Sequence, residues 1–154
     1  SISGWEYTGN AGVNPFYSDP ANRTGASSPF ADNGLIEDGA QVAFLQNQAT
    51  LSQTVEGFEA GKQYRVTYHE NARFQNGVAW PALVVELGGE VVVSPHVIEA
   101  TNDAGRDELP YVYVESAPFA PPAGGAYELV FRTTSANASS ALIDNVRVVE
   151  FDAN

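Results

Sequence analysis

The segment KQYRVTYHENARF, residues 62–74, decides the fold. Tyr64, Val66 and Tyr68 alternate with polar residues, and successive side chains of a β-strand point to opposite faces. The segment therefore predicts a strand over residues 62–73 that turns these three side chains into a core. The opposite face carries only polar side chains: Arg65, Thr67, His69, Asn71 and Arg73. Such a row is typical of a solvated strand, and it also fits a polar ligand-binding face.

Strand-like runs recur along the rest of the chain, and helix signals are nearly absent. Runs rich in Val, Tyr, Phe and Thr are separated by Gly, Pro, Asn and Asp. They predict further strands at 4–8, 41–46, 50–55, 80–87, 90–94, 110–115, 126–133 and 141–150. Many short strands with turns between them favour an antiparallel β-sandwich of the jelly-roll type. With no visible repeat or linker, we expect an all-β fold in one domain over residues 1–154.

The composition narrows the classes of partner. The chain has 19 acidic and 7 basic residues, a formal net charge of −12. This balance repels phosphate backbones and anionic lipid, so we expect no nucleic-acid partner and no membrane partner. The absence of cysteine excludes disulfides and thiolate chemistry. Because the chain begins at SISGW without a methionine or a signal peptide, we expect a processed or excised module of a secreted protein.

Two stretches lack any strand pattern. Residues 14–40 are rich in Pro, Ser, Asn and Gly, and residues 99–110 form a second irregular stretch. A loop as long as the first one, inside a compact domain, commonly either takes part in binding or lacks order. We expect two surface loops here.

Four segments together resemble a known family. In chain order they are GWEYTGNAGV (4–13), EDGAQVAFLQ (37–46), ATLSQTVEGFEAGKQYRVTYHENAR (49–73) and ALIDNVRVVE (141–150). They resemble the galactose-binding-like jelly-roll domains that serve as non-catalytic carbohydrate-binding modules in bacterial polysaccharide-degrading proteins. The resemblance implies recognition of a polysaccharide outside the bacterial cell, which brings an attached enzyme or cell surface to it. Members of the family usually carry another short strand before the Gly-Trp segment. In this chain that strand is either missing or replaced, which would expose the sheet edge that it covers. Trp5 is expected to be structural.

An aspartate stands among the apolar residues of the last strand, SSALIDNVRVVEF (139–151). A carboxylate in a buried strand costs free energy unless it is compensated. In the family that the chain resembles, an aspartate at this place helps to hold a structural calcium ion with groups of an early loop. The resemblance therefore implies Ca²⁺, an ion that takes oxygen ligands, held by Asp144, Asp38 and the Gly39 carbonyl, with Glu37 as a further candidate. Alternatively, Asp144 caps a turn or accepts hydrogen bonds from backbone amides near a bulge.

Sugar binding needs flat apolar groups that stack on a pyranose and planar polar groups that bond its hydroxyls. The stretch HENARFQNGVAW, residues 69–80, holds both kinds, and Trp80 is expected to begin the strand beside 62–73. If Val112 and Val114 point inward, the two neighbouring tyrosines point outward as a stacking pair. The candidate ligand-binding residues are therefore His69, Asn71, Arg73, Gln75, Trp80, Tyr111 and Tyr113.

The charged members of this set bear on the kind of sugar. Arg73 and His69 are compatible with an acidic or sulfated sugar, because a guanidinium pairs with anionic groups in a bidentate manner. Arg132 could join the same polar face, or it could pair with one of the many carboxylates.

No nucleophile–base pair, phosphate-binding glycine loop or histidine-rich zinc site can be assembled from the sequence. We therefore expect that the domain is not an enzyme. Two other classes stay open. One is a structural or adhesive module of a secreted bacterial protein without a small ligand. The other is a small β-sandwich hydrolase or lyase acting on glycans, for which Glu70 and Glu86 are the carboxylates to consider.

Overall fold

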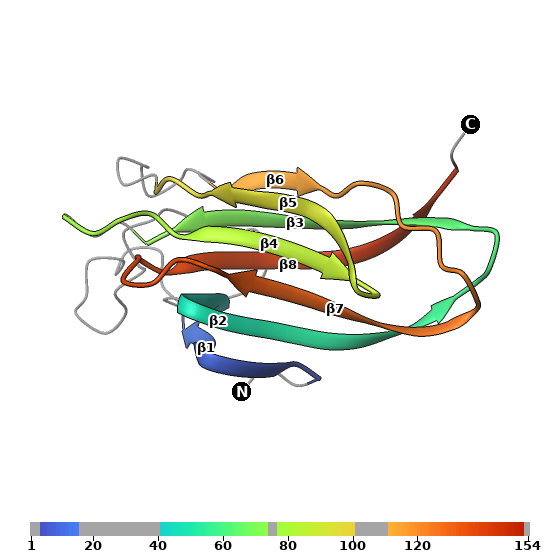
Figure 1. The fold of residues 1–154 in the computed structure, drawn as a ribbon, viewed down its shortest axis with the longest axis horizontal. Coiled ribbons are helices and arrows are strands. Elements are labelled where there is room, and N and C mark those ends of the chain that lie inside the picture. Colours follow the sequence, from blue (N-terminus) through green and yellow to red (C-terminus); the bar gives the residue numbers. More distant parts are fainter. Residues whose placement is uncertain (1–3, 16–40, 74–76, 101–110, 153–154) are drawn as a thin grey trace.

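The structure, a computed structural model, describes residues 4–15, 41–73, 77–100 and 111–152. These residues form an all-β fold of eight strands (Figure 1). The strands are β1 Glu6–Pro15, β2 Gln41–Phe58, β3 Gln63–Ala72, β4 Ala82–Leu87, β5 Glu90–Val97, β6 Val112–Glu115, β7 Gly125–Thr133 and β8 Ala141–Phe151. All the strand pairings among them are antiparallel. In the described part of the chain, no helix has the length and apolar character needed to cross a membrane.

Strand β2 belongs to both layers of the sandwich. The strand order is β5-β4-β7-β2-β8-β3-β6, and β1 pairs with β2 off this path. Residues 50–55 of β2 pair with β7, whereas residues 43–45 pair with β8. Between these halves, Asn47 has a φ of 58°, in the left-handed region that asparagine tolerates better than most residues. The chain therefore turns here from the layer of β3, β6 and β8 (the β3 layer) into the layer of β4, β5 and β7 (the β4 layer).

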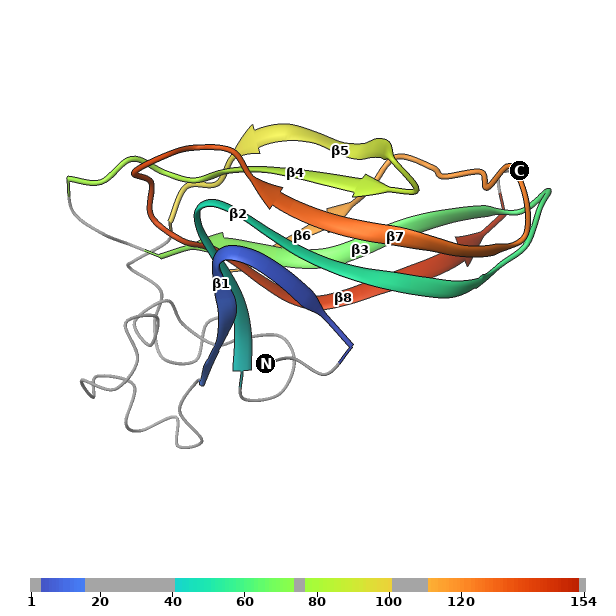
Figure 2. The same cartoon turned by 60° about the horizontal axis from the view of Figure 1, so that its bottom comes forward.

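Strand β1 follows the bend of β2, as Figure 2 shows. Gly9 lies at the register shift of this pairing and has a φ of 71°. A Cβ atom at this position would lie 2.7 Å from the Gln48 carbonyl oxygen. Glycine is therefore required for β1 to stay paired along both halves of β2.

The two layers pack on each other over one apolar core. Tyr68 of β3 is fully buried, and its ring meets Phe131 of β7 edge-on, with 5.1 Å between the ring centroids. Trp5, which lies just before β1, packs against Phe131 with 6.1 Å between the ring centroids. Tyr64 and Val66 are buried in the same cluster. The predicted inward face of strand 62–73 and the structural role of Trp5 are thus confirmed.

The predicted jelly-roll sandwich is confirmed as well, with two changes in strand boundaries. The run at 4–8 is the first part of a strand that extends to Pro15. The runs at 41–46 and 50–55 are one strand, because the polar residues 46–48 lie in the bend of β2 and not in a loop. Most of the two predicted loops, residues 16–40 and 101–110, lies outside the described residues.

Candidate functional site

The outer face of the β3 layer brings several predicted site residues together with others that were not predicted. His69 of β3 pairs with Tyr113 of β6 on one side and with Asp144 of β8 on the other. Cross-strand partners share a face of the sheet, so these three side chains form a row. We call His69, Tyr113, Asn145 and Arg147 the Tyr113 surface.

A β-bulge in β8 adds Asn145 to this surface. Thr67 pairs with Arg147 and His69 with Asp144, so β8 has one more residue than β3 over the same distance. Asn145 has a φ of 52°, and such a conformation is typical of a bulge residue. The extra residue lets Asp144, Asn145 and Arg147 all lie on the outer face. The Asp-Asn pair of the last strand is therefore the sequence signal of a bulge.

The Tyr113 surface joins an aromatic ring to planar polar groups. Tyr113 is 55% exposed, and its ring lies 5.3 Å from the His69 ring, tilted by 54°. Asn145 Nδ2 lies 3.5 Å from His69 Nδ1, and the Arg147 Nε–H donates to Asn145 Oδ1 at 3.1 Å. The side chains thus hold one another in place along the sheet.

Beside the Tyr113 surface, some side chains on the outer face of the β3 layer are buried. Val42, Leu142 and Tyr111 form a small second apolar cluster there. Burial raises the pKa of the Tyr111 phenol, and the negative charge of Asp144 raises it further. Asp144 itself is 9% exposed and lies beside this cluster.

This second cluster corrects two predictions. Tyr111 does share a face with Tyr113, but it is 5% exposed, so the expected pair of exposed phenols is wrong for Tyr111. Asn71 is 2% exposed, and its side-chain oxygen accepts a hydrogen bond from the Ala72 amide at 2.9 Å. The sequence did not reveal the burial of Tyr111, because Val42 and Leu142, which cluster with it, come from other strands.

The placement of Trp80 is also corrected. Trp80 is half-buried and precedes β4, which pairs with β5 and β7. Strand β3 is flanked by β6 and β8 instead. Trp80 therefore belongs to the opposite layer and does not begin the strand beside His69. Arg73 follows the end of β3, where its amide donates to the Ser140 carbonyl at 2.9 Å, and Gln75 lies outside the described residues.

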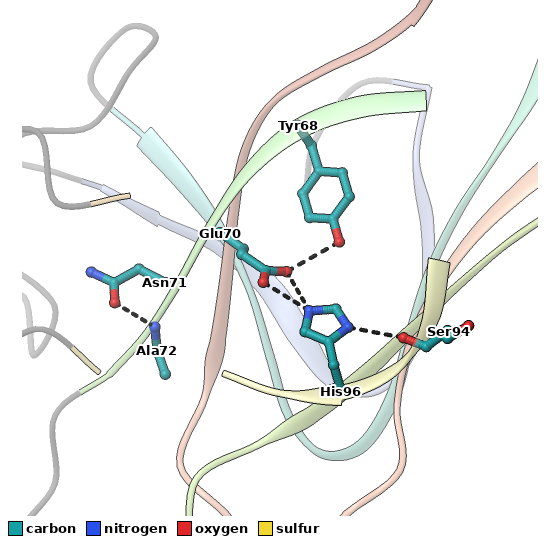
Figure 3. Close-up of polar contacts among 6 residues, drawn as sticks. All are labelled: Tyr68, Glu70, Asn71, Ala72, Ser94 and His96. Atoms are coloured by element: carbon teal, nitrogen blue, oxygen red, sulfur yellow. Dashed lines mark hydrogen bonds and ion pairs between the residues drawn. The ribbon is translucent and has the colours of Figure 1, made fainter. Parts of the chain in front are cut away.

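A second polar cluster lies between the layers, at the edge formed by β3 and β5 (Figure 3). Glu70 is 6% exposed, on the inward face of β3 with Tyr68. Its carboxylate accepts a hydrogen bond from the Tyr68 hydroxyl at 3.1 Å and faces His96 Nε2 at 2.7 and 2.9 Å. The other ring nitrogen of His96, Nδ1, donates to the Ser94 carbonyl at 3.0 Å. Both ring nitrogens therefore face acceptors, an arrangement that suits the protonated imidazolium.

This cluster separates the two carboxylates that a glycoside hydrolase would need together. Glu70 is turned into the sandwich, whereas Glu86 of β4 pairs with Arg132 of β7 at 3.3 Å on the outer face of the β4 layer. Arg132 consequently does not join the polar face of β3, and its alternative reading, a pair with a carboxylate, is confirmed. The Glu70–His96 contact was not predicted, because Glu70 and His96 are far apart in sequence.

A depression on the outer face of the β4 layer is a second place where a ligand could lie. It has a volume of about 350 Å³ and is lined by Thr8, Gln48, Ala49, Thr50, Arg132, Thr133 and Thr134. None of the described residues that line it is aromatic. The alternation of Thr50, Leu51 and Ser52 was the available sequence signal for a hydroxyl-bearing outer face.

The predicted calcium site is only partly within the described residues. Asp38 and Gly39, with Glu37, lie outside them. Among the residues that the structure describes, no group of three or more His, Cys, Asp or Glu side chains is placed to hold a metal ion. Asp144 fits the role of one ligand, since it is a buried carboxylate and calcium takes carboxylate oxygens.

Comparison with known proteins gives structural but not sequence matches. No protein-family model matches the chain, and no curated protein matches it. The CBM22-1 xylan-binding domain of Paenibacillus barcinonensis Xyn10C has a TM-score of 0.60 at 13% identity, covering 100% of this chain and 90% of that one.

Two further solved structures are similar to the same degree. TmCBM61, solved in complex with β-1,4-galactotriose, has a TM-score of 0.60 at 11% identity and covers 97% of this chain and 90% of its own. A cyclase from Fischerella sp. TAU, in complex with 4-(1H-indol-3-yl)butan-2-one, has a TM-score of 0.63 at 18% identity, with coverage of 100% and 88%. The chain therefore has the jelly-roll fold that these carbohydrate-binding modules and this cyclase share.

Proposed function

We propose that this domain binds a polysaccharide through the Tyr113 surface. The observation that carries the proposal is the exposed Tyr113 ring beside His69, with an amide and a guanidinium on the next strand. A pyranose presents C–H groups on its faces and hydroxyls at its rim. An exposed aromatic ring can stack on the first, and planar polar groups can bond the second.

The fold supports the same class of ligand. Of the structures with this fold, one is a xylan-binding domain and another was solved in complex with β-1,4-galactotriose. A flat sheet surface also suits a polymer, which extends past one sugar ring along the strands. In the proposed role the domain brings an attached catalytic or surface domain of a secreted bacterial protein to its polysaccharide. A structural or adhesive module without a sugar ligand is the alternative.

We propose in addition that Asp144 holds a structural calcium ion with Asp38 and the Gly39 carbonyl. The support is that Asp144 is a carboxylate only 9% exposed, and calcium takes carboxylate oxygens as ligands.

Replacing Tyr113 with alanine tests the binding surface. We expect the affinity for a bound polysaccharide to fall about tenfold or more, because a central aromatic anchor commonly contributes over 1 kcal/mol. The melting temperature should hardly change, since Tyr113 is 55% exposed. Affinity electrophoresis against plant and algal polysaccharides, followed by calorimetry, measures both. The matched control is Tyr7→Ala, which removes another exposed tyrosine, 48% exposed on β1, and should leave binding unchanged.

Two outcomes would contradict this proposal. If the wild-type domain binds no polysaccharide of the panel, the adhesive or structural alternative is favoured. If Tyr113→Ala binds normally while Arg132→Ala does not, the ligand lies in the depression on the β4 layer and not on the Tyr113 surface.

We also expect no turnover of any polysaccharide that the domain binds. Glu70 and Glu86 point to different sides of the β4 layer and are each bonded to a basic side chain, so they do not form an acid–base pair across one sugar. Reducing-end assays on bound polymers measure this. Product that disappears in Glu70→Gln or Glu86→Gln would show that the domain is an enzyme, a result that the shared fold of a cyclase makes worth testing.

A further inference from the structure

We propose that the polysaccharide is anionic, and that Arg147 binds its carboxylate or sulfate groups. This inference rests on the proposed sugar-binding role of the Tyr113 surface and specifies the ligand class of that surface.

Three basic residues of the described part of the chain have carboxylate partners. Lys62 lies 3.2 Å from Glu59 and 3.3 Å from Glu150. Arg65 lies 3.5 Å from Glu115, and Arg132 lies 3.3 Å from Glu86. These pairs use the cations to neutralise the protein's own acidic groups.

Arg147 differs from these residues. It is exposed, and it forms no ion pair with a carboxylate of the described residues, although the chain has 19 acidic against 7 basic side chains. Its Nε–H donates to Asn145 Oδ1 at 3.1 Å, and Asn145 in turn contacts His69. One edge of the guanidinium is thus held in place, and its terminal Nη groups have no partner among the described residues.

A guanidinium held in this way suits an anionic ligand. Its planar donors match the two oxygens of a carboxylate or sulfate, and holding the Nε edge lowers the entropy lost on binding. The Arg147 side chain lies on the same face as the Tyr113 ring, one residue pair further along β3. A sugar stacked on Tyr113 could therefore place an acidic substituent at Arg147.

The rest of the protein surface does not favour a polyanion. A net charge of −12 repels such a polymer, but this repulsion is screened beyond about 8 Å at physiological salt. Recognition of an anion must then come from a local group. The neighbouring Arg65 is already paired with Glu115. Arg147 is the arginine of the Tyr113 surface, and we assign this role to it.

The experiment compares polymers that differ in charge alone, at about 0.15 M salt. Polygalacturonate is paired with its methyl ester, and carrageenan with desulfated carrageenan, so that the two arms separate carboxylate from sulfate recognition. Neutral xylan and galactan complete the set. The variants are Arg147→Gln, Arg147→Lys and, as the control with the same change of charge outside both candidate sites, Lys62→Gln.

We expect the wild type to bind at least one charged polymer about tenfold or more tightly than its neutral counterpart. Arg147→Gln should lose this preference, so that charged and neutral polymers bind it about equally. Arg147→Lys should recover only part of the preference, because an ammonium lacks the planar fork. Lys62→Gln should behave as the wild type. Melting curves should be alike for all variants, since neither Arg147 nor Lys62 is buried.

Other results would overturn the inference. Equal binding of charged and neutral polymers, or a charge preference that survives in Arg147→Gln, would exclude Arg147 as the anion site and leave polysaccharide binding by Tyr113 intact. If the wild type binds none of the polymers, both the inference and the proposed function are wrong.

Discussion

Replacing His96 with alanine should lower the free energy of unfolding by about 3 kcal/mol, roughly 6–12 °C in melting temperature. The change leaves the Glu70 carboxylate, 6% exposed, with the Tyr68 hydroxyl as its remaining hydrogen-bond partner in this cluster. Loss of one partner of a buried ion pair typically costs 3–5 kcal/mol. We expect the lower end, because the His96 side chain is 31% exposed. Chemical denaturation with the linear extrapolation measures the effect.

A second variant separates the ion pair from simple loss of packing. In Glu70→Leu combined with His96→Ala, no carboxylate is buried without its partner, so the double variant should be more stable than His96→Ala alone. Lys62→Gln is the control for a surface pair and should hardly alter the curve, since exposed pairs contribute little. If His96→Ala unfolds like the wild type, the contact between β3 and β5 does not hold the edge of the sandwich.

The same pair predicts the direction of a pH effect. The hydrogen bond to the Glu70 carboxylate raises the pKa of His96, with a smaller contribution from the Ser94 carbonyl, and partial burial opposes the shift. Because the pKa is raised in the folded state, the folded protein binds this proton more tightly than the unfolded chain. The stabilisation is therefore fully present below about pH 6.5, the unfolded value, and is lost as the pH rises through the folded value. His96→Ala should remove this part of the pH dependence.

Removal of calcium should also lower the stability of the fold by a large amount. If Asp144 holds an ion that binds only the folded state, saturation at 100 times the dissociation constant adds about 2.7 kcal/mol of stability. Excess chelator should then lower the melting temperature by roughly 5–11 °C, and Asp144→Asn should abolish most of this response. Melting curves with added EDTA or calcium, together with metal analysis of the purified protein, measure it. Glu56→Gln, an exposed carboxylate on β2, is the control.

An unchanged melting curve in excess chelator, with no calcium found by metal analysis, would contradict the calcium proposal. Asp144 would then owe its burial to hydrogen bonds and to its position next to the bulge at Asn145. That was the alternative reading of the sequence.

Much of the fold follows from local sequence pattern. The alternation of Tyr64, Val66 and Tyr68 predicted which face of β3 enters the core, and all three are buried. Side-chain direction in a strand depends on the strand's own backbone, so it can be read without knowing the neighbours. The same local logic placed Tyr111 and Tyr113 on one face of the sheet. It also identified the strands, apart from the bend that joins two runs into β2.

The exposure of those side chains was decided by the tertiary structure. Asn71 and Tyr111 lie on the predicted face, yet they are 2% and 5% exposed. Val42 and Leu142, the residues that cluster with Tyr111, come from β2 and β8. A strand's own sequence contains no information about what another strand places over it.

The order of the strands could not be predicted from the sequence either, and this order decided which residues lie together in the site. Trp80 is close to His69 in the chain, but β4 entered the other layer. Tyr113, Asn145 and Arg147 are far from His69 in the chain, and the pairing of β3 with β6 and β8 brought them to it. Hydrogen bonds between segments distant in sequence set this order, whereas periodicity reports only on residues within one segment.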